Sequence, residues 1–498
     1  MKKTAIIIGS GFAGISAASF LAKNGWAVTV LEKHDQPGGR ARRLEVEGFT
    51  FDMGPSWYWM PDVFDRYFEK LGKQRKDYYE LHRLDPSYRV YWPDGHWDMP
   101  ASYDALKALF EKTETGAGEK LDKVMTEASY KYEVGINKLV HKPGRSLTEF
   151  LDWDLAKGVL KLDVFTSIKT HFSKHFKNAQ LRELMEFPVL FLGALPKDTP
   201  ALYSLMNYAD IKLGTWFPKG GMHSIVTGMH RLAVELGVQF LWEQDVQKIT
   251  VENGTASQVV TLHQNEKKIY EADVIISNAD YHFTETELLD EKYQTYNKKY
   301  WNSRVMAPSC LIYYVGLNKK ITDLQHHSLF FDVPFEPHAN DIYATPQWPD
   351  EPLFYVSATS VTDEMQAPPG CENLFFLIPV ASGLKGDDEH LRKKYFDKIV
   401  KRFEERTGEN IGGNIVYYKS YAQQDFITDY NAFKGNAYGL ANTLLQTAVL
   451  KPTCKSKKVN NLFFTGQLTV PGPGVPPALI SGEVVAGEVE KWFNSINK

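Results

Sequence analysis

TAIIIGSGFAGISAASFLAKNGWAVTVLEK, residues 4–33, decides the fold of this chain. Thr4–Ile8 is a short β-branched run, typical of a fully buried parallel strand. Apolar spacing predicts a helix over Ala13–Asn24, with Gly25 as its C-terminal stop, and Ala27–Leu31 as the next strand. This order of strand, helix and strand is a β-α-β unit, which predicts a doubly wound α/β sheet.

Three glycines follow the first strand with the spacing G-x-G-x-x-G. Gly9 turns the chain, Gly11 lets the backbone approach a pyrophosphate, and Gly14 lets the helix pack closely on the strand. Glu32 ends the second strand, where a carboxylate can accept hydrogen bonds from ribose hydroxyls. The combination indicates a dinucleotide site more strongly than it indicates a glycine-rich turn with a surface glutamate. NAD and FAD share this pattern.

Two further segments bear on the choice of dinucleotide. Gly38-Gly39-Arg40 follows in one short loop and brings flexible backbone and a permanent cation toward the phosphates. Near the other end, Pro471–Gly474 leads into a helix from about Val475, whose N-terminal amides can face an anionic group. A flavin gains negative charge on reduction, so such a helix end favours FAD. A turn followed by a packing helix explains this segment equally well.

Composition excludes several classes of function. The chain has 498 residues, enough for two or three domains, and 43% are apolar. Its 57 basic and 61 acidic residues give a formal charge of -4, which does not favour nucleic acid as a partner. Cys310, Cys371 and Cys454 are odd in number and far apart, which excludes a disulfide framework and a Cys-x-x-Cys metal site. We expect no metal, no nucleic acid and a reducing cytoplasm.

The N-terminal residues superficially copy a secretory signal peptide, with Lys2 and Lys3 before an apolar run. Glycines at motif spacing interrupt that run, and the pattern continues into the second strand, so we expect folded structure instead. No later segment supplies the roughly 18 uninterrupted apolar residues that cross a bilayer.

The rest of the chain alternates between helix-like and strand-like segments. Long mixed segments between about Tyr67 and Lys219 have helical character, and Asn253-Gly254 is a strong hairpin signal. Further predicted elements are a helix at Met222–Gly237, a buried strand within Glu271–Asp280, strands at Ser309–Leu317, Glu372–Val380 and Asn461–Gly466, and a helix at the carboxy-terminal end.

Together these residues resemble the flavin amine oxidase superfamily and, within it, the bacterial phytoene desaturases, which are carotenoid desaturases of the FAD-only type. The G-x-G-V-P-x-A-x-x-S-G run and GPSWYWMP are much narrower signals than the glycine motif. The matching stretches are IIIGSGFAGISAASFLAKNGWAVTVLEK, QPGGRAR, GFTFDMGPS with WYWMPDVF, TWFPKGGM, DVIISNAD and LFFTGQLTVPGPGVPPALISG.

The resemblance implies an α/β fold with a Rossmann-like FAD-binding domain that is discontinuous in sequence. Its segments would be residues 1–75, 220–288 and 455–498. An α+β substrate domain would be inserted as residues 76–219 and 289–454.

Carried over residue by residue, the resemblance also implies a set of FAD contacts. The glycine motif would take the pyrophosphate and Glu32 the adenosine ribose, while the loop containing Arg40 would lie beside the phosphates. Val246 matches the adenine-facing backbone position. The segment after F-D-x-G and the carboxy-terminal run would border the flavin ring. The implied cofactor-binding residues are Gly9, Gly11, Ala13, Gly14, Glu32, Lys33, Gly39, Arg40, Gly54, Pro55, Ser56, Val246, Gly466, Val475, Pro476 and Ala478.

Three aromatic residues follow Gly54-Pro55-Ser56 directly. If that segment edges the flavin, Trp57, Tyr58 and Trp59 would form an apolar wall for a hydrocarbon substrate. The two tryptophans would serve equally well as packing between domains, with Tyr58 on the opposite face. Asp52 lies in the same stretch, but a carboxylate in F-D-x-G is at least as suited to capping a turn, so we assign no catalytic base.

A C40 polyene is practically insoluble, so the resemblance implies an enzyme that meets it at a membrane. Lys157–Asn178 sets four apolar side chains on one helical face, which is typical of a helix in an anionic lipid interface and also of a helix packed on its own domain. The resemblance favours a helical membrane-contact region at about residues 157–196, and a cytoplasmic protein peripherally associated with the inner face of the cell membrane. The four side chains are Phe165, Ile168, Phe172 and Phe176.

The expected function is FAD-dependent conversion of phytoene to lycopene by successive dehydrogenations, with electrons passing to oxygen or a quinone. A dry channel would hold an allylic C–H against a hydride acceptor. Alternatives are a later carotenoid 3,4-desaturase with a hydroxycarotenoid substrate, a carotenoid isomerase of the same fold, an amine oxidase, or a flavin-bound carotenoid carrier.

Overall fold

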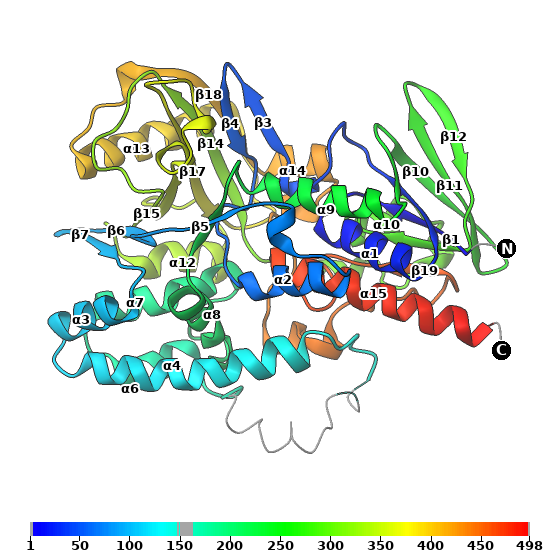
Figure 1. Ribbon diagram of the computed structural model, residues 1–498, viewed down its shortest axis with the longest axis horizontal. Helices are drawn as coiled ribbons and strands as arrows, with labels where there is room; N and C mark the ends of the chain where they lie inside the picture. Colours follow the sequence, from blue (N-terminus) through cyan, green and yellow to red (C-terminus); the bar gives the residue numbers. More distant parts are fainter. Residues whose placement is uncertain (1–2, 147–148, 150–162, 497–498) are drawn as a thin grey trace.

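The computed structural model describes residues 3–146, 149 and 163–496 (Figure 1). One half of the molecule is built on a five-stranded parallel sheet of order β19-β13-β1-β2-β9. This is the predicted doubly wound sheet, and its strands come from three separate parts of the chain. They are β1 (Thr4–Ile8), β2 (Ala27–Leu31), β9 (Gln239–Leu241), β13 (Val274–Ser277) and β19 (Leu462–Phe464).

Two helices from opposite ends of the chain cross on this sheet. They are α1 (Phe12–Lys23) and α15 (Val475–Ile496). A Cβ on Gly482 would overlap the carbonyl oxygen of Ala13, so the crossing requires a glycine there. Ser16 Oγ donates to the carbonyl oxygen of Leu479 at 2.7 Å across the same contact. The carboxy-terminal helix therefore closes the domain that the amino-terminal unit begins.

Smaller elements complete this half. Helix α9 (His223–Glu235) packs on α1, and a three-stranded antiparallel sheet contains the predicted hairpin. Asn253 and Gly254 both have positive φ there, as a tight two-residue hairpin turn requires. The remaining elements are β10 (Asp245–Glu252), β11 (Thr255–His263), β12 (Glu266–Tyr270), α2 (Pro61–Lys70), α10 (Tyr281–Thr286) and α11 (Lys298–Asn302).

The other half is built on a seven-stranded mixed sheet of order β18-β14-β17-β16-β15-β6-β7. The runs predicted as strands, β14 (Ser309–Leu317) and β17 (Glu372–Val380), lie side by side at full register and are almost wholly buried. Buried strands of this kind read as continuous apolar runs. The other strands are β6 (Tyr88–Trp92), β7 (Gly95–Met99), β15 (His327–Phe330), β16 (Phe354–Ser357) and β18 (Ile415–Tyr421).

The two faces of this sheet are covered by different helices. On one face the side chains of α13 (Glu389–Thr407) pack with alternate residues of β14, β16 and β17. The other face meets a helical region, seen at the lower left of Figure 1, and shares with it the largest apolar core. That region contains α3 (Tyr103–Thr113), α4 (Ala117–Val134), α6 (Ile168–His175), α7 (Ala179–Glu186), α8 (Leu205–Tyr208) and α12 (Phe335–Tyr343).

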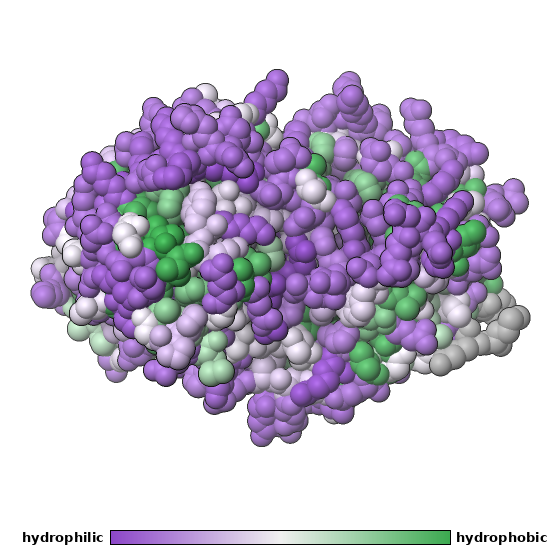
Figure 2. All heavy atoms as spheres, turned by 90° about the horizontal axis from the view of Figure 1, so that it is seen from above, coloured by the Kyte–Doolittle hydropathy of each residue, from purple (hydrophilic) through white to green (hydrophobic). Residues whose placement is uncertain are grey.

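Two short antiparallel pairs and one helix link the halves. They are β3 (Arg43–Val46) with β4 (Phe49–Asp52), β5 (Leu81–Arg83) with β8 (Trp216–Pro218), and α14 (Gln423–Tyr430). The face shown in Figure 2 is mainly hydrophilic, with hydrophobic residues in scattered patches.

The predicted lipid-facing helix is wrong for the residues that the structure describes. Helix α6 buries Ile168 and Phe172 completely, and Phe176 directly after it packs edge-on against Phe110 at 5.6 Å between ring centroids. Its apolar side thus faces its own domain, the alternative that gives the same periodicity. Phe165 alone of the four is exposed, at 86%. The part of the predicted helix at 157–162 lies outside the described residues.

The second apolar stretch of that region behaves in the same way. Phe187, Val189 and Leu195 are buried in the core shared with the seven-stranded sheet. In the described part of the chain, no helix has both the length and the hydropathy needed to cross a bilayer.

Phe172→Ala should lower the free energy of unfolding by about 3–5 kcal/mol, because it leaves a cavity in a closed core. Phe165→Ala, the matched control, should change it by less than about 0.5 kcal/mol. Chemical denaturation of the two purified variants measures both values. Equal effects would mean that α6 does not pack as described.

Candidate functional site

The glycine motif closes a cradle at the carboxyl end of β1. Gly9 has φ of +94°, which an L side chain rarely adopts, and a Cβ on Gly14 would overlap the carbonyl oxygen of Gly9. Gly38 pairs with Gly11 as a parallel bridge, and a Cβ on Gly39 would lie 3.4 Å from the Gly11 Cα. The structure therefore brings the two predicted glycine loops together, with bare backbone at the amino end of α1, where a phosphate binds best.

Glu32 lies beside this cradle at the end of β2. Its Oε2 accepts from the backbone N–H and the hydroxyl of Ser10, at 2.7 and 2.6 Å. Oε1 accepts from the His34 N–H at 3.0 Å. A carboxylate oxygen has two acceptor lone pairs, so Oε1 retains one for a ribose hydroxyl. Val246 is buried in β10, two residues after Gln244, whose N–H donates to the Glu32 carbonyl at 2.7 Å.

The structure adds Asn278, to which the sequence analysis assigned no role. It follows β13, and its Nδ2 donates to the Gly9 carbonyl at 3.3 Å. A Cβ built on Gly11 would lie 3.0 Å from that nitrogen, and one on Gly466 would lie 3.2 Å from Oδ1. Asn278 thus joins the amino-terminal cradle to the carboxy-terminal loop. Its position at the carboxyl end of a strand beside β1 was the available signal, since ligands of doubly wound sheets bind at that edge.

Arg40 is a buried cation whose hydrogen bonds are incomplete. Nη2 donates to the carbonyl oxygen of Asn436 at 3.3 Å, and the guanidinium carbon lies 5.2 Å from the centre of the Tyr430 ring. Nε has no partner among the described residues. Burial lowers the pKa of Arg40, while the charge of Asp280 opposes that effect. A buried guanidinium with a free N–H fits an anionic group such as a pyrophosphate.

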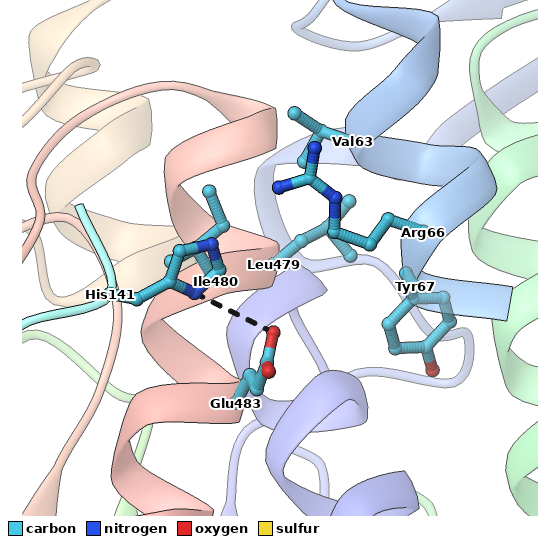
Figure 3. Close-up of a pocket in the computed structure, with 7 residues that line it drawn as sticks. All are labelled: Val63, Arg66, Tyr67, His141, Leu479, Ile480 and Glu483. Atoms are coloured by element: carbon cyan, nitrogen blue, oxygen red, sulfur yellow. Dashed lines mark ion pairs between the residues drawn. The ribbon is translucent and has the colours of Figure 1, made fainter. Parts of the chain in front are cut away.

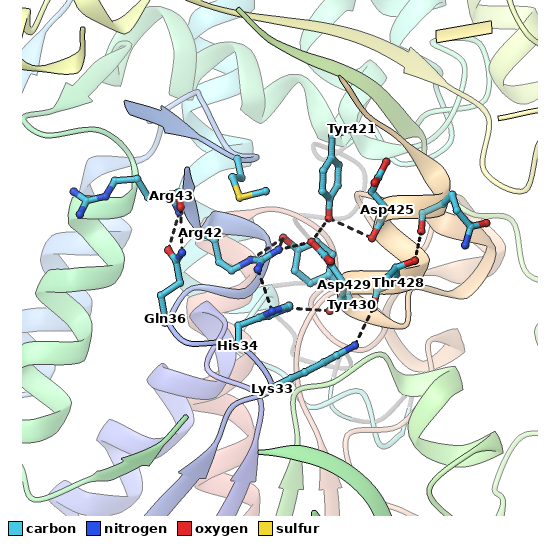
Figure 4. A network of polar contacts seen from close by, with 12 residues as sticks. Lys33, His34, Gln36, Arg42, Arg43, Tyr421, Asp425, Thr428, Asp429 and Tyr430 are labelled. Carbon is cyan, nitrogen blue, oxygen red and sulfur yellow. Dashed lines mark hydrogen bonds and ion pairs between the residues drawn. The ribbon is translucent and has the colours of Figure 1, made fainter. Parts of the chain in front are cut away.

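The loop after β2 is tied to α14 by a polar network (Figure 4). Lys33 Nζ donates to the Thr428 carbonyl at 2.8 Å, so its ammonium is directed at the end of α14. Arg42 pairs with Asp429, donates to the Tyr430 hydroxyl at 3.3 Å, and lies 3.0 Å from His34 Nδ1. Burial opposes the charge of Arg42, but Tyr430 and Asp429 together raise its pKa. The network fixes the cradle relative to the seven-stranded half.

The first turn of α15, which begins at Val475, offers fewer backbone N–H groups to a ligand than a helix start normally does. Pro476 and Pro477 carry no N–H, and the Ala478 N–H donates within the helix to Gly474. Val475 is therefore the one residue of 475–477 that carries an N–H. Ser481 Oγ accepts from the Gly466 N–H at 3.0 Å and holds the loop on the helix.

A second cation lies against this loop. Lys451 is buried, and its Nζ donates to Asn442 Oδ1 at 2.8 Å. A Cβ on Gly472 would overlap this amine. Burial lowers the pKa of Lys451 to about 7. No sequence pattern marks this lysine, because its burial depends on the fold.

Asp52 serves as a cap, one of the two roles left open. Its carboxylate accepts from the N–H groups of Met222 and His223 at 2.7 and 2.9 Å, at the start of α9. Burial raises its pKa to about 6, against the effect of these hydrogen bonds.

Gly54 packs so closely on the Arg40 carbonyl that a Cβ would overlap it. The Gly54–Ser56 segment thus lies directly against the cradle loop.

The aromatic residues that follow point in different directions. Tyr58 is fully buried on the nucleotide-domain side, stacked on Phe64 and hydrogen bonded to the Tyr79 hydroxyl at 2.9 Å, so its prediction as a substrate contact is wrong. Extended backbone alternates its side chains between two faces, which explains the separation. Trp59 is buried in the large core and donates to Thr215 Oγ1 at 2.8 Å.

Trp57 is the aromatic residue best placed for a ligand. Its ring stacks on His327 at 4.2 Å between centroids and lies 5.5 Å from the Tyr355 ring. Its Nε1 is buried and has no partner within the described ranges. The role of Trp57 beside a substrate stays a prediction, now on the side of the large apolar core.

Two small pockets lie near these elements. One, between α2, α15 and the segment after α4, contains a His141–Glu483 pair at 3.8 Å but no residue of the glycine loops (Figure 3). It is lined by Val63, Arg66, Tyr67, His141, Leu479, Ile480 and Glu483. The other adjoins the Gly54–Ser56 segment and is lined by Phe51, Asp52, Ser56, Ser357, Thr359, Asn373 and Phe375.

One group in the described residues has the composition of a metal site. Glu127, His171 and His175 lie together on α4 and α6, with His171 Nε2 at 3.8 Å from Glu127 Oε2. This group is in the helical region, on elements that carry no residue of the cradle.

Gly11→Val should leave the protein folded but remove most of its bound flavin, because the nearest atom to the new Cβ is a side-chain amide while the pyrophosphate needs that space. Gly487→Ala is the control, since nothing lies within 4 Å of the Gly487 Cβ position. Absorbance of purified protein gives the flavin ratio, and thermal unfolding reports the fold. Full flavin content in Gly11→Val would remove this cradle as the cofactor site.

Comparison with known proteins places this geometry in a family. The family of flavin containing amine oxidoreductases matches residues 12–489. A carotenoid 3,4-desaturase of Haloarcula japonica is 40% identical over 482 residues, which cover 96% of each chain. A zeta-carotene-forming phytoene desaturase of Myxococcus xanthus is 31% identical, covering 98% of this chain and 94% of its own.

Solved structures agree on the fold. An oxidoreductase from Methanosarcina mazei has a TM-score of 0.62 at 15% identity, covering 97% of this chain and all of its own. Putrescine oxidase bound to putrescine has a TM-score of 0.58 at 13% identity, covering 98% of this chain and 99% of its own.

The cradle, the free guanidinium N–H of Arg40 and the acceptor on Glu32 fit FAD. The chain belongs to the flavin containing amine oxidoreductase family and is an FAD-dependent oxidoreductase of its carotenoid desaturase group.

Proposed function

We propose that this enzyme removes two hydrogens across the 3,4 carbon–carbon bond near one end of an acyclic C40 carotenoid. The observation that carries the proposal is the apolar core that begins beside the cradle. Gly54 contacts the Arg40 loop, and three residues later Trp57 enters the core between the seven-stranded sheet and the helical region. The Haloarcula japonica relative, a carotenoid 3,4-desaturase by name, supports the choice of bond.

The chemistry requires a hydride acceptor and a dry, shaped surrounding for the polyene. FAD supplies the hydride acceptor when it is bound. The chain supplies orientation and exclusion of water through apolar and aromatic side chains. The ring centroids of Trp59, Tyr88 and Phe187 lie 5.1, 5.4 and 6.2 Å from that of Trp57. Such a wall favours a hydrocarbon.

A second candidate is the conversion of phytoene toward lycopene. The Myxococcus xanthus relative, a zeta-carotene-forming phytoene desaturase, favours it at 31% identity over nearly the whole chain. Both candidates use the same cofactor site and differ in which carbons of the polyene lie beside it.

We also propose that the enzyme works at the inner face of the cell membrane and passes its electrons to oxygen or a quinone. The insolubility of the substrate supports the first point, and the need to reoxidise the cofactor supports the second. Phe165, exposed three residues before α6 begins, is a candidate for lipid contact because its ring is not buried in the fold.

Expression in bacteria that accumulate either phytoene or a longer acyclic carotenoid tests the proposed bond. We expect added conjugation, seen as a red shift in the pigment extract, with the longer carotenoid. Colour formed from phytoene would instead establish the second candidate. A chain that changes neither pigment, while retaining flavin, would contradict both.

Phe165→Ser should reduce co-sedimentation with liposomes that contain anionic lipid, because an exposed ring inserted at the interface is lost. Met365→Ser, which alters another highly exposed side chain, is the control. Flavin content and thermal unfolding should be the same in both variants. Wild-type protein that stays in the supernatant would argue against membrane contact.

A further inference from the structure

Three buried polar atoms without partners gather on one side of the large apolar core. They are Trp57 Nε1, His327 Nε2 and Ser357 Oγ, and none has a hydrogen-bond partner in the described part of the chain. His327 is completely buried, and Ser357 is 3% exposed. Buried polar groups are normally paired, so three orphans at one place call for a function.

The sheet puts these groups side by side. His327 on β15 and Ser357 on β16 are directly opposite each other in the antiparallel register, so their side chains share a face. Trp57 stacks on the His327 ring at 4.2 Å. The face is that of the large core, because Leu329 and Tyr355, two residues along each strand, belong to it.

Tyr355 holds the imidazole in place. Its hydroxyl lies 2.6 Å from His327 Nδ1, which leaves Nε2 as the free nitrogen. The hydroxyls of Ser56 and Ser357 lie near the same phenol, but Ser357 Oγ makes no bond of acceptable geometry. Ser56 and Ser357 also line the pocket beside the Gly54–Ser56 segment. The three orphans therefore lie where the core meets the cradle.

The cluster is uncharged. Burial, reinforced by the neighbouring His326, holds the pKa of His327 well below its usual range, so the imidazole is neutral. Trp57 can only donate, Ser357 can donate and accept, and neutral His327 offers one or the other at Nε2. The nearest carboxylate, Asp52, lines the adjoining pocket with Ser357, but it already accepts from the Met222 and His223 N–H groups. An alcohol, which both donates and accepts, matches the three unpaired groups.

We propose that Trp57, His327 and Ser357 bind a hydroxyl group carried near the reacting end of the carotenoid. This assignment rests on the proposed function and deepens it. The Trp57 N–H donates to the hydroxyl oxygen, and Ser357 or His327 accepts the hydroxyl proton. A hydrocarbon end leaves all three groups unpaired, so the site discriminates in favour of the hydroxylated substrate.

Ser357→Ala is the central test, with Ser328→Ala as its matched control. Both serines are buried, and among the described residues neither hydroxyl has a partner. Ser328 on β15, however, points to the same side as Phe330 and so faces α13. Removing an unpaired buried hydroxyl should leave the thermal midpoint of either variant unchanged or higher. Trp57→Phe keeps an aromatic ring and loses the N–H donor. It provides a second test of the same preference for the hydroxylated carotenoid if Ser357→Ala is unstable.

The measurement compares an acyclic carotenoid that carries a tertiary hydroxyl near its end with the same carotenoid lacking it. Binding is followed by quenching of tryptophan fluorescence in wild type and the two serine variants, and kcat/KM by product absorption. We expect the hydroxylated-to-hydrocarbon ratio to fall about tenfold in Ser357→Ala, the scale of one buried hydrogen bond, and to be unchanged in Ser328→Ala.

The outcomes separate this inference from the proposed function. Turnover of both carotenoids with equal ratios in all three proteins would overturn the hydroxyl site and keep the desaturase. Preferential binding of the hydroxylated carotenoid that depends on Ser357, without turnover of either, would keep the site and overturn the proposed reaction. A wild-type ratio of one would also overturn the site.

Discussion

The structure depends on one close approach, that of backbone to backbone at the amino end of α1. Gly14 packs on the Gly9 carbonyl, and Gly482 packs on the Ala13 carbonyl, so three segments meet at distances that no Cβ allows. The first contact brings α1 onto β1, and the second brings α15 onto α1. Asn278 fills the remaining gap and bonds to Gly9. The cradle is therefore a consequence of packing that the sheet needs in any case.

A second constraint couples this cradle to the seven-stranded half. Arg40 and Arg42 follow the cradle in sequence. The Arg40 guanidinium donates to the Asn436 carbonyl, just after α14, and the Arg42 guanidinium pairs with Asp429 in α14. Gly54 then presses on the Arg40 carbonyl before the aromatic stretch enters the large core. The Arg40 loop and the aromatic stretch are thus successive parts of one segment, held together by backbone contact and by charge.

Much of this could be predicted from local sequence. Thr4–Ile8, Ala27–Leu31, Ser309–Leu317 and Glu372–Val380 form strands with the bounds that their apolar runs indicate, because burial on both faces leaves an unbroken signal. The hairpin turn could be predicted from Asn253-Gly254 alone, because this pair readily adopts the positive φ angles of a two-residue turn. Periodicity could not tell whether Phe172 and Phe176 faced lipid or protein, since both surroundings demand the same apolar stripe. The positions of Asn278 and Lys451 at the site could not be predicted, because their contacts are with residues distant in sequence or are set by burial.

The alternation of Trp57, Tyr58 and Trp59 shows how much a single residue step decides. Tyr58 finds its hydroxyl partner in Tyr79 on the nucleotide side, and Trp59 finds Thr215 in the large core. Trp57 faces the same core as Trp59 but has no acceptor for its N–H among the described residues. A protein selected only for stability would fill that position with a ring that carries no donor, since an unpaired N–H opposes folding. Trp57 instead stacks on a neutral histidine in the same condition, and under the proposed hydroxyl site the acceptor for its N–H arrives with the substrate.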